Sequence, residues 1–201
     1  MKWSAYAVEQ EVDGGREVHL LVSVEASDED GAARTPLLVN LVLDRSSSMT
    51  GAPLAAAVEA AEQIVDGCGP EDHVGLVMFD GVVEERVPPI AVDESGGRRL
   101  REALRGISPG RGTALHQAIR TGASALARLL LPGRKPKLVL LTDGEPSVGP
   151  RKPAAFQALG EEVAASGVAL HALGLGAHYL PDILTALTLP SGNAFSHADG
   201  P

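Results

Sequence analysis

The chain is poor in aromatic residues, cysteine, basic residues and long apolar runs. Only 3% of its 201 residues are aromatic, so the core must be built from Ala, Val, Leu and Ile. Cys68 is the one cysteine, so no disulfide can form within the chain. Acidic residues outnumber basic ones by 26 to 17, and the net charge of −9 argues against a partner rich in phosphate, such as a nucleic acid. No apolar run approaches the ~20 residues of a membrane helix.

The amino-terminal residues also lack the continuous apolar stretch of a signal peptide. We therefore expect a globular, cytoplasmic protein with no membrane segment in this chain and no nucleic-acid partner.

Two strands near the amino terminus are predicted to form a hairpin. The turn sequence Asp13-Gly14-Gly15 separates two alternating stretches, residues 6–12 and 18–24. Residues 27–36 form a polar loop. We expect residues 1–36 to be an amino-terminal β extension and residues 37–201 to be the main domain.

The main domain alternates predicted strands with predicted helices. Near-continuous apolar runs at 37–43 and 137–142 are typical of strands buried on both faces of a parallel sheet. Further strands are expected at 73–79, 82–87, 168–173 and 193–197, and helices at 53–65, 98–105, 114–131, 153–165 and 181–187. The tight turn Asp80-Gly81 makes 82–87 an antiparallel edge strand.

This alternation predicts an α/β fold with a doubly wound, mostly parallel central sheet and helices on both faces. In the usual strand order 3-2-1-4-5-6, ligands bind outside the carboxyl ends of strands 1 and 4, at the switch point. Asp44 follows the first core strand and Asp143 follows the fourth, so both carboxylates are expected in that crevice. Thr113 precedes the helix that leads into the fourth strand, and its loop can reach the same place.

Hydroxyl groups accompany these carboxylates. Ser46 and Ser48 follow Asp44 on the same loop, at a spacing of two, and no histidine or cysteine is among them. Such an all-oxygen set suits Mg²⁺, Mn²⁺ or Ca²⁺ better than zinc or copper. Because hydroxyls are neutral ligands, the cation would still attract an anionic oxygen, such as a partner's Asp, Glu or C-terminal carboxylate. The alternative is that Ser46 and Ser48 only cap the helix near Pro53, and that Asp44 only caps the loop.

Three segments resemble the metal-ion-dependent adhesion site (MIDAS) of von Willebrand factor type A (vWA) domains. Residues 41–49, Leu-Val-Leu-Asp-Arg-Ser-Ser-Ser-Met, resemble the D-x-S-x-S signature; residues 111–115 and 140–144 are similar to the Gly-Thr-Ala-Leu and Leu-Thr-Asp-Gly segments of this family. The resemblance implies that Ser46, Ser48 and Thr113 bind the metal directly, and that Asp44 and Asp143 bind it directly or through water. It also implies a protein-binding module, often found in intracellular multiprotein assemblies or beside AAA+ ATPases.

Residues 1–36 resemble the β extension of some bacterial vWA proteins. Arg45, beside the predicted site, is a candidate for modulating the choice of partner.

Catalysis is the alternative class of function. The chain has no Gly-x-x-x-x-Gly-Lys-Ser/Thr phosphate loop and no Gly-x-Ser-x-Gly elbow. A phosphotransferase with a strand-end Asp nucleophile would need a second Asp where Ser46 stands. A metal-dependent hydrolase would need a general base, for which Glu145 is the one nearby candidate. We therefore expect a binding module and not an enzyme.

Overall fold

The computed structural model describes the backbone of residues 2–12, 15–25, 35–129, 131–143, 145–175, 180–192 and 196–198, with side chains between 35 and 192. The chain separates into two compact units, residues 1–34 and residues 35–201.

The first unit is an antiparallel hairpin. Strand β1 (Lys2–Val12) pairs with β2 (Gly15–Glu25) in a register that runs from Lys2 opposite Glu25 to Val12 opposite Gly15. The predicted hairpin is confirmed, with strands longer than the alternating stretches suggested. Most of the predicted polar loop, residues 26–34, lies outside the described residues.

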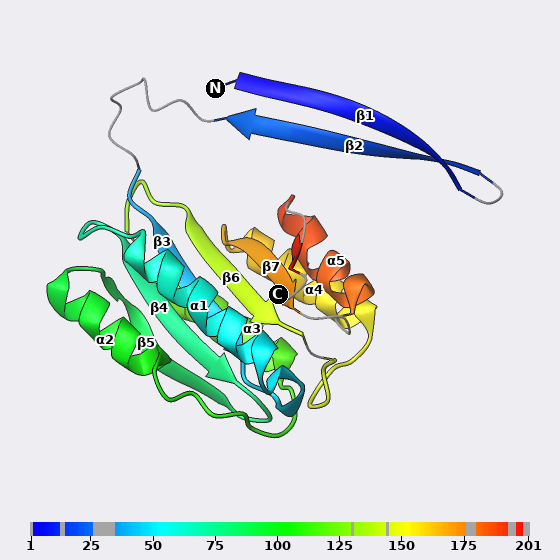
Figure 1. The fold of residues 1–201 in the computed structure, drawn as a ribbon. Helices are drawn as coiled ribbons and strands as arrows, with labels where there is room; N and C mark the ends of the chain where they lie inside the picture. Colours follow the sequence, from blue (N-terminus) through cyan, green and yellow to red (C-terminus); the bar gives the residue numbers. More distant parts are fainter. Residues whose placement is uncertain are drawn as a thin grey trace. The chain divides into compact units, whose positions relative to one another are not determined.

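The second unit contains a sheet of six strands in the order β5-β4-β3-β6-β7-β8 (Figure 1). Four pairings are parallel and the β4–β5 pairing is antiparallel. Numbered from the first strand of the unit, this is the order 3-2-1-4-5-6, so the predicted doubly wound fold is confirmed. The strands are β3 (Leu38–Asp44), β4 (His73–Phe79), β5 (Val83–Ala91), β6 (Pro136–Thr142), β7 (Ala169–Leu175) and β8 (Ser196–Ala198).

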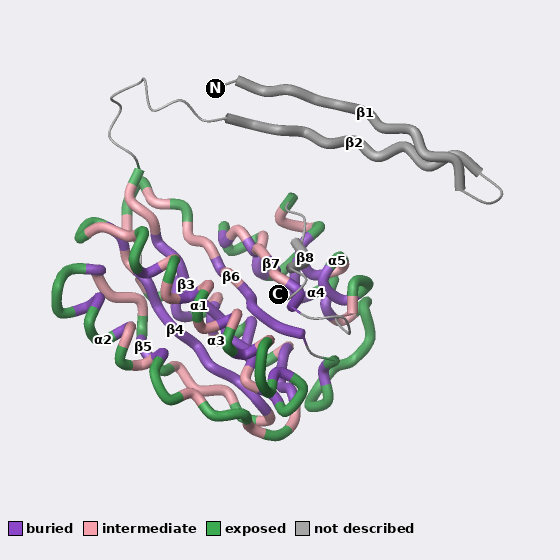
Figure 2. The backbone as a smooth tube through the Cα atoms, viewed as in Figure 1, coloured by how far each residue is buried: buried purple, intermediate pink, exposed green. Residues whose placement is uncertain are grey.

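Helices cover both faces of this sheet, and β3 shows why. Leu41 and Leu43 lie in a core cluster with residues of α1 and α2, whereas Leu38 and Val42 lie in a second cluster with residues of α3, α4 and α5. Strand β3 is buried along its whole length (Figure 2), and it is apolar at every position except Asn40 and the terminal Asp44, as the run at 37–43 indicated. The helices are α1 (Ala52–Asp66), α2 (Glu94–Leu104), α3 (Leu115–Arg128), α4 (Pro153–Ala165) and α5 (Pro181–Thr188), with short 3₁₀ turns η1 (Ser47–Met49) and η2 (Leu189–Ser191).

Two element boundaries differ clearly from the predictions. Helix α2 begins at Glu94 instead of 98, because the side chain of Asp93 accepts a hydrogen bond from Gly96 N at 2.8 Å and caps the helix ahead of two glycines. Strand β5 continues to Ala91 instead of ending at Val87, through Pro88 and Pro89. An edge strand tolerates proline because one side of it needs no ladder hydrogen bond.

Among the described residues, no helix is both long enough and apolar enough to cross a membrane.

Candidate metal centre

The two predicted carboxylates lie at the same end of the two central strands. Asp44 is the last residue of β3, and Asp143 directly follows the last residue of β6. The strands are parallel neighbours, with Leu43 opposite Leu141, and the arrowheads of β4 and β6 in Figure 1 point toward this end. The carboxyl ends of β3 and β6 therefore form the switch point that the strand order predicted.

A chain of hydrogen bonds joins four of the five predicted ligands. Ser46 N donates to Asp44 Oδ1 at 2.8 Å, the hydroxyls of Ser46 and Ser48 lie 3.0 Å apart, and Ser48 Oγ donates to Asp143 Oδ1 at 3.0 Å. The 3₁₀ turn η1 shapes this loop, and its fully buried Met49 anchors the turn to the core. Serine hydroxyls from the loop after β3 and a carboxylate from the loop after β6 thus face a common space.

The alternative that the two serines cap a helix is wrong. Helix α1 has Gly51 at its N-cap, with no side-chain capping hydrogen bond, and the Ser46 side chain does not cap η1 either. Asp44 does accept a hydrogen bond from the loop, at Ser46 N, as that alternative expected. Each carboxylate oxygen can accept more than one interaction, so this bond to Oδ1 does not by itself prevent Asp44 from meeting a cation.

Thr113, the fifth predicted ligand, is held through its backbone N–H and carbonyl by the loop after β6. Its N–H donates to Ser147 Oγ at 2.8 Å, and its carbonyl accepts from Ser147 N at 3.1 Å and Val148 N at 3.2 Å. The next residue, Ala114, donates from N to the carbonyl of Asp80 at 2.7 Å. The loop before α3 is therefore fastened to the loops after β4 and β6, with Thr113 only 5% exposed.

Sequence reasoning missed two buried polar residues at this end of the sheet. Thr142, the last residue of β6, donates from Oγ1 to Asp44 Oδ2 at 2.5 Å. Asp80, which follows β4, forms an ion pair with Arg45 at 3.1 Å and accepts a hydrogen bond from Val82 N at 2.8 Å. Asp80 was interpreted only as a turn residue, although it has the same signal as Asp44 and Asp143: a carboxylate at the carboxyl end of a core strand.

The fit around Asp80 depends on a glycine. A Cβ atom at Gly110 would lie 1.8 Å from Asp80 Oδ2, so no larger residue fits there without movement. Gly110 N also donates to the carbonyl of Arg45 at 2.7 Å, which ties the loop before α3 to the loop that carries the serines.

Burial dominates the electrostatics of Asp44. Loss of solvent raises the pKa of the fully buried Asp44 carboxyl to about 6, and the negative charge of Asp143 adds to this effect. Hydrogen bonds from Thr142 and Ser46 oppose the shift but do not cancel it. An ionised Asp44 is therefore costly at neutral pH unless a cation lies close to it.

The donor chemistry fits a hard divalent cation. The five predicted ligands offer two carboxylates and three hydroxyls. The part of the chain that the structure describes contains no group of three or more His, Cys, Asp or Glu side chains suited to a metal. Any metal held at this end of the sheet would therefore depend on Ser46, Ser48 and Thr113 as much as on Asp44 and Asp143. Oxygen ligands of this kind match Mg²⁺, Mn²⁺ or Ca²⁺.

The fold and the polar cluster together define a doubly wound α/β domain with a candidate ligand site at its switch point. The family model of the von Willebrand factor type A domain matches residues 39–145, and the chain belongs to this family. The matched region includes Asp44, Ser46, Ser48, Thr113 and Asp143.

Relatives come from distant organisms. The chain is 27% identical over 203 residues to a Synechocystis protein named sll0103, covering 96% of this chain and 46% of that one. It is 26% identical over 194 residues to human inter-alpha-trypsin inhibitor heavy chain H4, covering 93% of this chain and 21% of that one. A solved von Willebrand factor type A structure from Catenulispora acidiphila superposes with a TM-score of 0.72 at 17% identity, covering 90% of this chain and 40% of that one. The chain thus spans less than half the length of these relatives.

Proposed function

We propose that this domain is a metal-dependent protein-binding module of the MIDAS type. In this proposal Asp44, Ser46, Ser48, Thr113 and Asp143 hold a divalent cation, Mg²⁺ or Mn²⁺ in preference to Ca²⁺. A carboxylate of another protein, from Asp, Glu or a C-terminus, completes the coordination. The observation that carries the proposal is the hydrogen-bonded series from Ser46 through Ser48 to Asp143, which gathers hydroxyl and carboxylate oxygens from two loops at one point.

The types of ligand favour a metal site that binds a partner protein over a structural metal site whose ligands all come from this chain. Hydroxyls contribute no charge, and a bound cation would keep an affinity for one more anionic oxygen. The Asp44 carboxylate is fully buried, so in this proposal it holds the cation and does not contact the partner protein. Ser48 is exposed and lies at the open side of the cluster, where a partner's carboxylate can approach.

The cellular setting is also a proposal. The resemblance to vWA proteins that work in intracellular assemblies or beside AAA+ ATPases favours a cytoplasmic multiprotein complex. Affinity purification of the full-length protein from its own cells, in Mg²⁺ and in EDTA, tests this setting. Partners recovered only in Mg²⁺ that are extracellular proteins would contradict it.

Binding to the metal is the first experiment. Titration of the purified protein with Mn²⁺, followed by electron paramagnetic resonance, should reveal one site that Mg²⁺ competes for. Ser48→Ala should weaken this site about tenfold or more, because a ligand is lost, while Ser124→Ala on the exposed surface of α3 serves as the matched control. Equal Mn²⁺ affinity in both variants would reject the assigned ligands.

Location of the metal is the second experiment. Crystals soaked in Mn²⁺ should show anomalous density between Ser46, Ser48 and Thr113. Density at another place, with this position lacking it, would reject the proposed centre.

A further inference from the structure

The loops around the candidate metal centre contain more basic than acidic side chains, although the chain as a whole is acidic. The described residues of these loops are 45–51, 80–82, 105–114, 143 and 145–152. They contain five basic side chains, which we call the basic rim: Arg45, Arg105, Arg111, Arg151 and Lys152. Once Asp44 and Asp143 are assigned to the cation, Asp80 and Glu145 are the acidic side chains left in these loops. The chain as a whole carries a net charge of −9, so this end of the sheet is a basic area on an acidic protein.

The basic rim is held in place by the same contacts that build the site. Arg111 accepts a hydrogen bond at its carbonyl from Gly81 N at 2.8 Å, directly beside the Gly112-Thr113 segment. Arg151 donates to the carbonyl of Ser147, whose hydroxyl accepts from Thr113 N. Four of the five side chains are exposed to solvent. Arg45 is a quarter exposed and is paired with Asp80, which neutralises one of the two remaining acids.

Exposed apolar side chains gather at the same end. Three large apolar residues in the described part of the chain are exposed, and two of them, Val82 (70%) and Val148 (43%), lie in these loops. A Cβ atom at Gly112 would lie 3.2 Å from Gly81 Cα and 3.4 Å from Val148 Cγ2, so the turn bearing Val82 and the loop bearing Val148 both adjoin Gly112. The apolar pair therefore borders Thr113, one of the predicted ligands.

We infer that the partner of this domain is an acidic protein segment with an apolar residue beside its metal-binding carboxylate. One carboxylate would reach the cation, further carboxylates would lie against the basic rim, and the apolar side chain would contact Val82 and Val148. The inference rests on the proposed metal-dependent function and goes beyond it by stating the composition of the partner. A partner with one isolated carboxylate would use neither the basic rim nor the exposed valines.

Charge complementarity supports an acidic protein over other anions. The carboxylates of an acidic partner would meet exposed guanidinium and ammonium groups around the metal centre, which favours approach at the basic rim. Nucleic acid is disfavoured because the net charge of −9 repels a long phosphate backbone that extends past this small area.

Short peptides with an uncharged dye test the composition directly. We would measure fluorescence anisotropy in Mn²⁺ and in EDTA with three peptides of equal length: one Asp among Gly and Ser, three acidic residues among Gly and Ser, and three acidic residues preceded by Leu. A single-stranded oligonucleotide of similar length is the fourth probe. In Mn²⁺ we expect the three-acid peptide to bind about tenfold more tightly than the one-acid peptide, and the Leu peptide to bind more tightly still.

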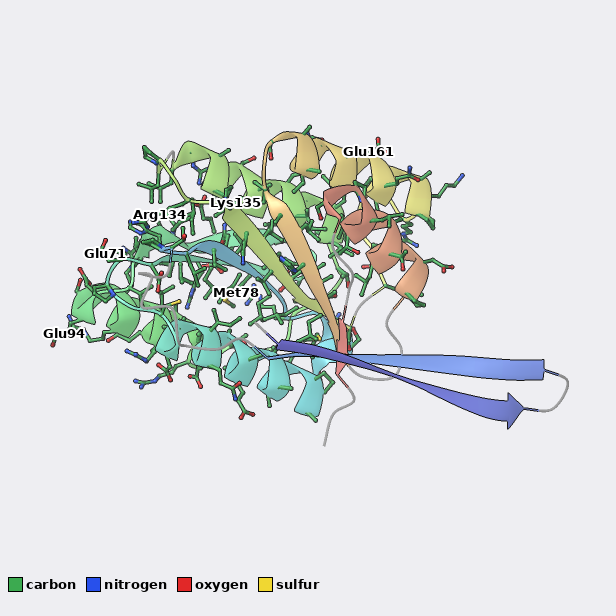
Figure 3. The ribbon with its side chains drawn as sticks, turned by 90° about the horizontal axis from the view of Figure 1, so that it is seen from above. Glu71, Met78, Glu94, Arg134, Lys135 and Glu161 are labelled. Carbon is green, nitrogen blue, oxygen red and sulfur yellow. The ribbon has the colours of Figure 1, made fainter. Side chains whose placement is uncertain are left out.

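Charge-reversal variants assign the effect to the basic rim. The variant Arg111→Glu/Lys152→Glu should bind the three-acid peptide about tenfold more weakly, to the level of the one-acid peptide, while it still binds Mn²⁺ at least as tightly as the unmodified protein. The matched control is Arg99→Glu/Lys135→Glu, which makes the same change of charge on exposed residues elsewhere. Figure 3 shows Lys135 beside the start of β6, at the opposite end of the strands from the site. The control should bind like the unmodified protein.

The possible outcomes separate this inference from the proposed function. If the peptides bind equally well in Mn²⁺ and release in EDTA, the metal-dependent module stands and the acidic partner is rejected. If the two charge-reversal variants lose the same affinity for the three-acid peptide, the loss reflects the net charge of the protein. A specific role of the basic rim is then rejected. If the oligonucleotide binds as tightly as the three-acid peptide, the inference that the partner is an acidic protein segment is rejected. If no peptide binds in Mn²⁺ although the Mn²⁺ site is present, both the inference and the proposed function are rejected.

Discussion

Thr142 Oγ1 donates a hydrogen bond of 2.5 Å to Asp44 Oδ2, and this bond links the ends of the two central strands. Both residues are at most 1% exposed. The bond explains how a carboxylate remains in the core with one oxygen bound to a hydroxyl and the other to Ser46 N. It also sets the orientation in which Asp44 meets the space between the serines and Asp143.

Replacement of Thr142 by Val keeps the shape of the side chain but removes this donor. We expect the free energy of unfolding to fall by about 1–3 kcal/mol, because the buried Asp44 oxygen loses its partner. The pKa of Asp44 should also rise further above its usual range, since the Thr142 bond is the largest of the contributions that lower it. Urea unfolding in EDTA measures the change. A loss no larger than that of Thr50→Val, at an exposed position outside the core, would contradict this role.

Asp44→Asn should stabilise the metal-free protein at neutral pH. Asparagine can still accept from Ser46 N, and its amide can donate to the Thr142 hydroxyl after that hydroxyl rotates. The substitution removes a buried charge whose ionisation between pH 3.8 and about 6 costs the native state about 3 kcal/mol. Because the folded pKa lies above the unfolded one, the native state retains the proton longer, and stability falls as pH rises through this window.

Thermal unfolding in EDTA at several pH values tests whether stability falls as the pH rises, as expected for Asp44. The unmodified protein should lose stability between pH 4 and 7, whereas Asp44→Asn should lose much less and have the higher melting temperature at pH 7.5. In Mn²⁺ the unmodified protein should have the higher melting temperature, because Asp44→Asn lacks a ligand carboxylate. A large loss of melting temperature in EDTA at pH 7.5 would show that Asp44 has a structural role instead.

Gly110→Ala should disturb the site through the loop before α3. The added methyl group would lie 1.8 Å from Asp80 Oδ2, so either the Asp80–Arg45 ion pair or the loop must move. We expect a loss of about 1–3 kcal/mol in stability and a weaker Mn²⁺ site. Gly67→Ala is the control, since its methyl group would meet only ordinary contacts, the nearest at 3.4 Å. Equal stability and equal Mn²⁺ affinity in the two variants would refute the close fit.

No hydrolysis of phosphoesters, nucleotides or peptides above background is expected from the purified protein in Mg²⁺ or Mn²⁺. Glu145, the one nearby base that the sequence offered, is exposed in the loop after β6. A general base works from a fixed position within hydrogen-bond reach of the water that it activates. Metal-dependent turnover that disappears in both Thr113→Ala and Glu145→Gln would establish an enzyme and overturn the binding module. Turnover unaffected by either substitution would indicate a contaminant.

The sequence alone predicted the strand order, because apolar runs that alternate with helices leave few ways to build a parallel sheet. It also predicted that Asp44 and Asp143 lie together, since each follows a central strand and parallel strands end at the same edge. Helix α4 was predicted at 153–165, where Pro153 marks its first turn, and the structure has it there. The start of α2 was predicted four residues too late, because the capping bond of Asp93 outweighs the low helix propensity of Gly96 and Gly97.

What only the tertiary structure decided is how the loops at that end meet one another. Thr142 bonds to Asp44 across 98 residues of sequence, and Thr113 N bonds to Ser147 across 34. The pairing of Arg45 with Asp80, the close approach of Gly110 and the gathering of Val82 and Val148 have no local sequence pattern. Hydrophobic periodicity determines which face of an element is buried, and so it determines the sheet. The contacts between loops depend on distances of a few ångströms between side chains far apart in the chain, and these exist only after the strands have been brought together.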